Sequence, residues 1–392
     1  MLINFTGIGW YFLILGILVG FSLLFLYCLP FFKKLIAMEE HGRFETLDGL
    51  RGFLALNVFF QHAVTNYFYF QTGVWQIVPV KFYRHLGGEA VILFFMITSF
   101  LYWSKAIAQG GNLDAGALYR SRFLRLAPMY LFSAGIVIAS ILIQSGFSID
   151  LLQTAKDILS WLSLGLITTT SVNHISVIPI NAGIHWTLSF EWGFYLILPV
   201  LAVALKSKKA LLMSLPLAFF ALSSPDRGYW AIFFFGIMAA HIYKNYPKIS
   251  FFSQPISSLV PILGIITVYF ISYKPYSLTQ YFVSLVVFLS FVYGADLFGL
   301  LKTEVAKFLG AISYSIYLLH GIVLFGVLHS VDYFYPIKAL SPIAFWSLIL
   351  LSGIIIIFIS SITYRYIEYP FIKRIKATKK ESIKLAITDQ VM

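Results

Sequence analysis

Apolar runs of about twenty residues recur along this chain, and a run of that length crosses a bilayer as a helix. Eleven such runs lie at 10–32, 52–70, 88–108, 126–145, 186–205, 210–223, 229–243, 256–272, 280–298, 308–330 and 341–363. The composition agrees, since 59% of the residues are hydrophobic and 11% are charged, against about a quarter charged in an average soluble domain. We therefore expect an all-α, polytopic transmembrane bundle of about eleven spans.

The distribution of Lys and Arg predicts which side of the membrane each loop faces. With the N-terminus outside and the C-terminus in the cytoplasm, six of the 28 Lys and Arg fall outside: Lys81, Arg84, Lys156, Arg227, Lys274 and Lys338. The others lie inside, as the positive-inside rule requires. A weak apolar run at 158–168 would invert every later loop if it crossed, so we expect a re-entrant or interfacial segment there. Most of the net charge of +12 is then explained by the positive residues of the cytoplasmic loops, so it does not indicate a nucleic-acid partner. Part of it also suits an anionic ligand or lipid headgroups.

Few ionisable side chains lie inside the expected spans, and each is a functional candidate because burying it in lipid is costly. His62 follows Arg51 by eleven residues, close to three helical turns, so both side chains point to one face. Glu191 and His320 lie inside two later spans. A lone membrane histidine can also be a structural hydrogen-bond donor between helices, and for His320 the two interpretations weigh equally.

An arginine cluster precedes the fourth span. Arg120, Arg122 and Arg125 lie in a cytoplasmic loop, and the last two are three residues apart, so they project together from a helical start. Paired guanidinium groups suit phosphates, although ordinary positive-inside charge also explains them. Cys28 is the only cysteine and no Cys/His cluster has zinc spacing, so we expect neither a disulfide nor a bound metal.

Six segments form an ordered series at 47–62, 87–101, 122–130, 186–199, 313–320 and 368–370. Together they resemble the signature motifs of the membrane-bound acyltransferase 3 family, over roughly residues 45–372. The resemblance implies a ten-span acyltransferase core at 45–372, preceded by a transmembrane anchor and cytoplasmic linker at 1–44 and followed by a basic cytoplasmic tail at 373–392. The family usually has Ser-Gly-Phe where this chain has Thr98-Ser99-Phe100, which we expect to alter helix packing slightly.

The resemblance also implies a function. It predicts an O-acyltransferase of the bacterial cytoplasmic membrane that takes an acetyl group from cytoplasmic acetyl-CoA, the acyl donor. The acceptor would be a hydroxyl of a cell-surface or lipid-linked glycan, such as lipopolysaccharide O-antigen.

Site residues follow from the same motifs. His62 is the candidate general base or acyl-carrying nucleophile, and Arg51 and Glu191 are its candidate catalytic partners. The candidates for donor binding are Arg120, Arg122, Arg125 and Tyr130, and those for substrate binding are Tyr195, Tyr317 and His320. The outer stretch 146–185 is expected to shape the acceptor site with Asn173, His174, Asn181 and His185.

Two other classes of protein stay open. A multi-span transporter or flippase for an anionic or lipid-linked substrate also needs buried charges and broken helices. A membrane scaffold or sensor with degenerate motifs is the third possibility, and the intact Arg and His motifs argue against it. The oligomeric state is also open, a homodimer included.

Overall fold

The computed structural model describes residues 6–38, 44–146, 148–167, 169–206, 227–272 and 275–377 except 376. Its helices are α2 (Ile8–Cys28), α3 (Pro30–Met38), α4 (Glu45–Thr72), α5 (Lys81–Ala108), α6 (Ala115–Gln144), α7 (Leu151–Leu162), α8 (Ile178–Asn181), α9 (Trp186–Val203), α11 (Arg227–Asn245), α12 (Leu259–Ile271), α13 (Leu278–Tyr293), α14 (Glu304–Ala311), α15 (Ser313–Phe334) and α16 (Pro342–Thr363), which a π-helical turn at Tyr364–Glu368 extends. One two-stranded hairpin pairs β1 (Ser171–Val172) with β2 (Ile175–Ser176). The expected span at 210–223 and most of the tail at 373–392 lie outside the described residues.

Six helices in the described ranges are long and apolar enough to cross a membrane: Ile8–Cys28, Lys81–Ala108, Ala115–Gln144, Trp186–Val203, Ser313–Phe334 and Pro342–Ile375. Two shorter apolar helices are Pro255–Ile271 and Leu278–Tyr293. The 28-residue α4 is not among them, because Asn57, Gln61, His62 and Asn66 interrupt its apolar run. The prediction of an all-helical, multi-pass membrane protein is confirmed, and the count of eleven spans stays a prediction.

Local chemistry explains where several helices begin and end. Asp114 caps α6 by accepting a hydrogen bond from the backbone N–H of Ala117 at 3.0 Å, and such caps satisfy a donor that has no partner within the helix. Gly73 ends α4 with a φ of +73°, a left-handed conformation that glycine adopts without strain. The expected run at 10–32 is broken at Leu29, and a new helix starts at Pro30 because proline has no N–H for a continuous helix.

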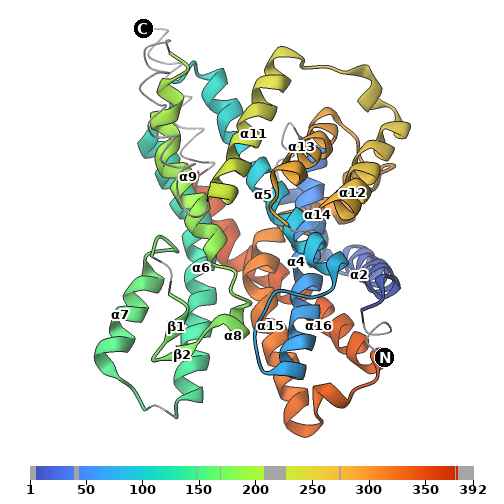
Figure 1. Ribbon diagram of the computed structural model, residues 1–392. Helices are drawn as coiled ribbons and strands as arrows, with labels where there is room; N and C mark the ends of the chain where they lie inside the picture. Colours follow the sequence, from blue (N-terminus) through green and yellow to red (C-terminus); the bar gives the residue numbers. More distant parts are fainter. Residues whose placement is uncertain are drawn as a thin grey trace.

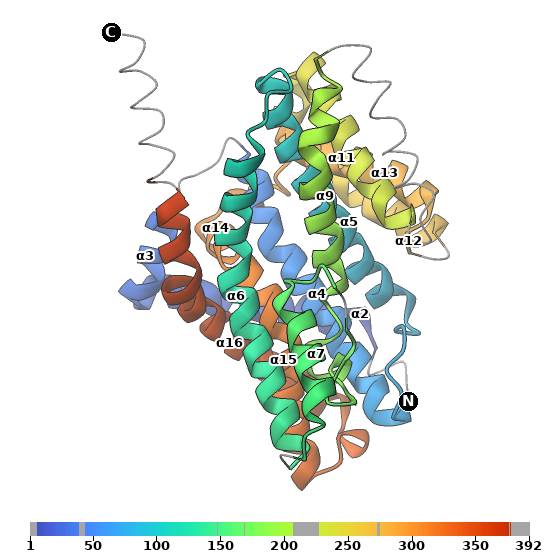
Figure 2. The ribbon, with the colours of Figure 1, turned by 90° about the vertical axis from the view of Figure 1, so that its left-hand side faces the viewer.

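The helix in this region, Leu151–Leu162, starts earlier than the short apolar segment expected at 158–168 and overlaps only its first part. Leu164 and Gly165 follow it with φ values of +58° and +87°, so the helix cannot continue through the predicted range. This helix, α7, stands beside the Gln144 end of α6 in both views (Figures 1 and 2). It is too short to span a bilayer, so α7 is compatible with the predicted non-spanning role.

The N-terminal helix α2 packs against the helices that follow. The Tyr11 hydroxyl donates a hydrogen bond to Asn57 of α4 at 2.9 Å, and Trp10 stacks on Trp346 of α16 with ring centroids 6.2 Å apart. The segment predicted as an anchor therefore also contacts two helices of the predicted core.

Helices α5 and α11 approach each other closely at Ser99, where the acyltransferase 3 family usually has glycine. Ser99 of α5 donates hydrogen bonds to the carbonyls of Phe95 and Met96 in its own helix, and Gly236 of α11 lies against it. A Cβ atom at Gly236 would come within 1.9 Å of the Ser99 hydroxyl and 2.7 Å of the Met96 carbonyl. Gly236 thus leaves the space that the extra serine side chain occupies, as small residues often do between membrane helices.

Substitution Gly236→Ala is therefore expected to lower the melting temperature of the detergent-purified protein by several degrees, because overpacking a close helix contact costs about 1–3 kcal/mol. Gly326→Ala in α15 is the matched control, since a Cβ there meets nothing within 4 Å. Adding Ser99→Gly to Gly236→Ala should restore part of the loss, because the nearest clashing atom is removed. A Gly236→Ala protein as stable as the control would contradict this account of the packing.

Candidate active site

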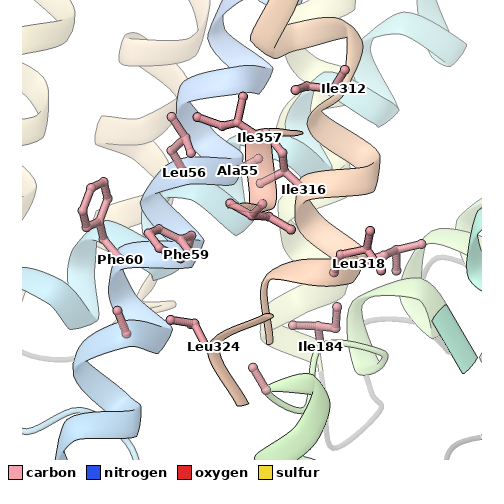
Figure 3. Close-up of a cluster of buried hydrophobic side chains, with 14 of the residues drawn as sticks. Ala55, Leu56, Phe59, Phe60, Ile184, Ile312, Ile316, Leu318, Leu324 and Ile357 are labelled. Carbon is pink, nitrogen blue, oxygen red and sulfur yellow. The ribbon is translucent and has the colours of Figure 1, made fainter. Parts of the chain in front are cut away.

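An apolar core fixes the relative register of α4 and α15. Ala55 and Phe59 of α4 are buried together with Ile316 of α15 (Figure 3). His62 follows Ala55 by seven residues and His320 follows Ile316 by four, so each histidine continues the same helix face as its apolar neighbours. The packing of these two helices therefore brings the two imidazoles together.

His62 and His320 form a hydrogen-bonded pair. Nδ1 of His62 lies 2.9 Å from Nε2 of His320, and the two rings stack with centroids 5.0 Å apart and planes 19° apart. His320 is fully buried and His62 is half-buried. Trp75, from the loop after α4, also stacks with His62 at 6.3 Å.

The partners of the pair determine which nitrogens carry protons. Nδ1 of His320 lies 3.2 Å from the carbonyl oxygen of Ile316, which can only accept, so this nitrogen carries hydrogen. In a neutral His320, Nε2 is then an acceptor, and His62 must donate to it from Nδ1. This arrangement leaves the Nε2 lone pair of His62 available to take a proton or attack a carbonyl carbon.

A cavity of about 220 Å³ has Tyr317, a neighbour of His320, in its wall. Six of the candidate residues line it: Arg51, Arg122, Arg125, Glu191, Tyr195 and Tyr317. Much of the remaining wall is apolar, including Phe94, Phe95 and Leu101. His62 and His320 are not among the lining residues, and His62 lies roughly 16 Å from Arg51 along α4. Tyr317 connects the two places, with its ring 6.0 Å from that of His320.

Arg122 is held by aromatic rings at the cavity wall. Its guanidinium lies 4.9 Å from the ring of Tyr102 and 5.8 Å from that of Tyr195. Its Nε is buried without a hydrogen-bond partner among the described residues. Within those residues neither Arg122 nor Arg51 forms an ion pair. Neither guanidinium group is therefore held in an ion pair, although the carboxylate of Glu191 lines the same cavity and an anionic ligand would have to compete with it.

Arg125 is engaged differently. It forms a 2.6 Å ion pair with Glu368, whose carboxylate also accepts a hydrogen bond from Ser315. The π-helical turn at Tyr364–Glu368 carries this glutamate inward to a fully buried position, and such turns are frequent at functional sites. The donor-binding role of Arg125 stays a prediction, and in this structure its guanidinium has a carboxylate partner.

Arg120 and Tyr130 lie away from the cavity. Arg120 is exposed on α6. Tyr130 lines a separate, much smaller cavity together with Trp161 and His185. Neither residue is brought to the cavity with Arg122, and their donor-binding roles stay predictions.

The substrate-binding candidates on α9 and α15 are fixed by hydrogen bonds. The Tyr195 hydroxyl donates to the Glu191 carboxylate one helical turn earlier. The hydroxyls of Tyr317 and Thr187 lie 2.8 Å apart and share a hydrogen bond. Glu191 thus faces the cavity with one oxygen already engaged.

Several residues at this site were missed by sequence reasoning. Tyr102 and Thr187 line the cavity, and Lys105 lies with them. Glu368 was recognised as part of a motif without a role. Thr187 had a local signal because it lies inside the motif at 186–199, and Tyr102 had one because it follows the motif at 87–101 directly.

The polar residues of the outer stretch mostly hold that stretch together. Asn173 donates to the Ser148 carbonyl at 2.8 Å and accepts from Thr154 at 3.2 Å. His174 pairs with Asp150 at 3.1 Å. Hydrogen bonds to Asp150 from the backbone N–H of Gln153 and from His174 keep the pKa of its carboxyl below its usual value. The expected role of this stretch in acceptor binding stays a prediction.

No group of three His, Cys, Asp or Glu side chains converges on a metal position in the part of the chain that the structure describes. Comparison with known proteins gives one match. A family model described as an acyltransferase domain matches residues 44–365. No curated protein and no solved structure matches the chain. The matched range contains every residue discussed at the cavity except Glu368.

Proposed function

Since the chain belongs to the acyltransferase 3 family, we propose that it is an O-acetyltransferase of the bacterial cytoplasmic membrane. It takes the acetyl group of cytoplasmic acetyl-CoA and transfers it to a hydroxyl of a cell-surface or lipid-linked glycan, such as lipopolysaccharide O-antigen. The observation that carries the proposal is an arginine-lined cavity whose wall includes Tyr317, the ring of which lies 6.0 Å from that of His320 in the histidine pair.

The cavity suits the acyl donor. CoA carries phosphates, and planar guanidinium groups bind phosphate oxygens in pairs. Arg51 and Arg122 supply such groups without an ion-paired neighbour in the described residues, and the apolar wall around Phe94 and Phe95 suits an uncharged pantetheine arm. The donor would enter from the inner side, where the positive-inside rule puts Arg51 and Arg122.

The histidine pair suits the chemical step. Nε2 of His62 takes the proton of the acceptor hydroxyl as that oxygen attacks the thioester carbon. The C–S bond then breaks, and the CoA thiolate receives the proton from His62. In the covalent alternative, Nε2 attacks the thioester first, and CoA leaves as a thiol with the proton that the His62 ring gives up. The hydroxyl then attacks the acyl-imidazole, and its proton returns to the imidazole as the acyl–nitrogen bond breaks. Both routes use the same nitrogen, and His320 sets the tautomer that frees it.

The proposal is tested with purified protein in proteoliposomes. Acetyl-CoA labelled in the acetyl group is supplied with methyl hexopyranosides as acceptors, and both free CoA and labelled sugar are measured. An acetyltransferase releases CoA and labels the sugar in equal amounts. A transporter or flippase releases no CoA, and that result would overturn the proposal.

Substitution Arg122→Ala is expected to raise KM for acetyl-CoA about tenfold or more, because a charge-assisted hydrogen bond to phosphate contributes about 1.5–3 kcal/mol. Arg122→Lys should fall between wild type and Arg122→Ala, since lysine keeps the charge without the planar fork. Initial rates at varied acetyl-CoA measure the effect.

Arg120→Ala is the comparison for Arg122→Ala, because Arg120 lies two residues earlier and is exposed. A rise in KM for Arg122→Ala alone supports donor binding in the cavity. Equal rises for both variants would mean that the positive charge of this segment, rather than the cavity, attracts the donor.

A further inference from the structure

Three aromatic side chains from different elements meet beside the proposed active site. Trp186 begins α9, Tyr229 lies in the first turn of α11, and Tyr276 precedes α13. The ring of Tyr229 lies 4.6 Å from that of Trp186 and 4.9 Å from that of Tyr276, and the planes are 48° and 71° apart. All three are half-buried. We call these three residues the aromatic corner.

The backbone at Tyr276 is held in an uncommon conformation. Its φ is +65°, a value that non-glycine residues seldom adopt and that costs about 1–3 kcal/mol. The Tyr276 N–H donates to the side-chain oxygen of Gln280 at 2.8 Å. Gln280 in turn donates to the carboxyl of Glu89 at 2.9 Å. The two supporting side chains are buried, at 0% and 6% exposure.

This support is more elaborate than a residue in a lipid-facing aromatic belt needs. Interfacial Trp and Tyr anchor a helix through their amphipathic rings alone. Here a buried carboxyl in α5 and a buried amide in α13 together fix one turn, and no ion pair to Glu89 exists among the described residues. Burying such a group is costly unless it is hydrogen-bonded or paired, and Glu89 is hydrogen-bonded by the Gln280 amide that fixes the Tyr276 turn.

Helix α5 connects the aromatic corner to the histidine pair. Gly88 leaves room for the Tyr276 turn, since a Cβ there would lie 3.2 Å from Pro275 and 4.0 Å from the Tyr276 hydroxyl. The preceding Gly87 lies against Gln61, the neighbour of His62. Two consecutive residues of one helix thus contact the corner and the segment that carries His62.

A second connection runs through the cavity wall. Phe95 lines the cavity and lies 6.3 Å from the ring of Trp186. Thr187, the next residue after Trp186, is hydrogen-bonded to Tyr317. The aromatic corner therefore adjoins the part of the cavity wall formed by Phe95, Thr187 and Tyr317.

We propose that the aromatic corner of Trp186, Tyr229 and Tyr276 is the acceptor subsite, where a pyranose ring stacks while its hydroxyl reaches His62. An aromatic face matches the C–H face of a pyranose ring, and the tyrosine hydroxyls offer hydrogen bonds at its edge. Glu89 and Gln280 hold the Tyr276 turn in place. This inference rests on the proposed acyl transfer to a glycan and adds the residues at which the acceptor sugar binds.

The test compares a methyl hexopyranoside with the acyclic polyol sorbitol as acetyl acceptors. Tyr276→Ala is expected to raise KM for the pyranoside roughly tenfold, about the loss of one stacked ring, with little change for sorbitol. Tyr276→Phe keeps the ring and should stay near wild type. Gln280→Leu removes the acceptor of the Tyr276 N–H and should also raise KM for the pyranoside.

Tyr269→Ala is the matched control, because Tyr269 is a half-buried tyrosine of α12 that contacts Lys81 outside the corner. KM for acetyl-CoA, measured in the same variants, shows whether the donor side is intact. An unchanged pyranoside KM in Tyr276→Ala would overturn the subsite, as would an equal loss in Tyr269→Ala. Failure of the proposed function gives a different result, since wild type would then release no CoA with either acceptor.

Discussion

Replacing His62 with alanine is expected to lower kcat for acetyl transfer by about a hundredfold or more, in line with the 10²–10⁴-fold contribution of a positioned general base. The Nε2 atom of His62 is the reacting nitrogen on both proposed routes, so neither route survives its removal. Initial rates of CoA release with a saturating pyranoside measure the loss.

Binding of the donor separates this catalytic effect from misfolding. His62 does not line the cavity, so the His62→Ala protein should still bind acetyl-CoA with near wild-type affinity and elute as wild type in size-exclusion chromatography. Wild type incubated with acetyl-CoA alone, followed by mass spectrometry, reports whether an acetylated histidine accumulates. Normal acetyl transfer by a folded His62→Ala protein would exclude His62 from the chemistry.

Replacing His320 with leucine should lower kcat by roughly tenfold to a hundredfold while leaving KM for acetyl-CoA unchanged. His320 does not contact the acyl group in this scheme and acts through His62, whose Nδ1 proton it accepts. Loss of that acceptor lets His62 adopt the tautomer that blocks Nε2, and the loss of a tautomer-fixing partner is costly in other histidine-dependent enzymes.

Two readouts distinguish positioning from simple support of the fold. His320→Gln should recover part of kcat, because a glutamine oxygen can accept from His62, whereas leucine cannot. Nitrogen NMR of histidine-labelled protein should show the Nδ1-protonated form of His62 in wild type and a mixture of tautomers in His320→Leu. Equal activity of the leucine and glutamine variants would assign His320 a packing role.

The sequence singled out individual candidate residues of this site, but it did not indicate which of them contact one another. Ionisable side chains inside apolar runs are so costly that His62, Glu191 and His320 stood out without any structure, and Arg51 was selected by its spacing from His62. Spacing also placed Arg122 and Arg125 on one helix. What spacing cannot supply is the rotation and height of one helix against another, and these depend on packing among side chains far apart in the chain.

Two pairings show this limit. His62 and His320 are 258 residues apart and meet because the apolar surfaces of α4 and α15 fix one register. Arg125 was grouped with its neighbour Arg122 from their i, i+3 spacing, yet it turns to Glu368 across 243 residues. The π-helical turn that moves Glu368 inward has no signature in the residues 364–368 themselves.

The bounds of one expected non-spanning segment differ from those of the helix in the structure, for a local reason. The apolar letters of 158–168 suggested one segment, but the chain turns at Leu164 and Gly165, and the helix begins earlier, where Asp150 caps it. Hydropathy averages over a window and does not register a cap or a left-handed residue. The positive-inside count, which sums over many residues, is less sensitive to such details.

The ion pair between Arg125 and Glu368 also has a consequence for biosynthesis. The ribosome makes the arginine 243 residues before the glutamate, a delay of roughly 10–50 s at ordinary elongation rates. During that interval the guanidinium is at the membrane without its final partner and must find water, lipid phosphate or a chaperone. The turn that carries Glu368 follows α16, so this ion pair forms after α15 with its His320 has been made. A chain that stalls before that point would lack the carboxylate that holds Arg125, so one wall of the cavity would be left without its final support.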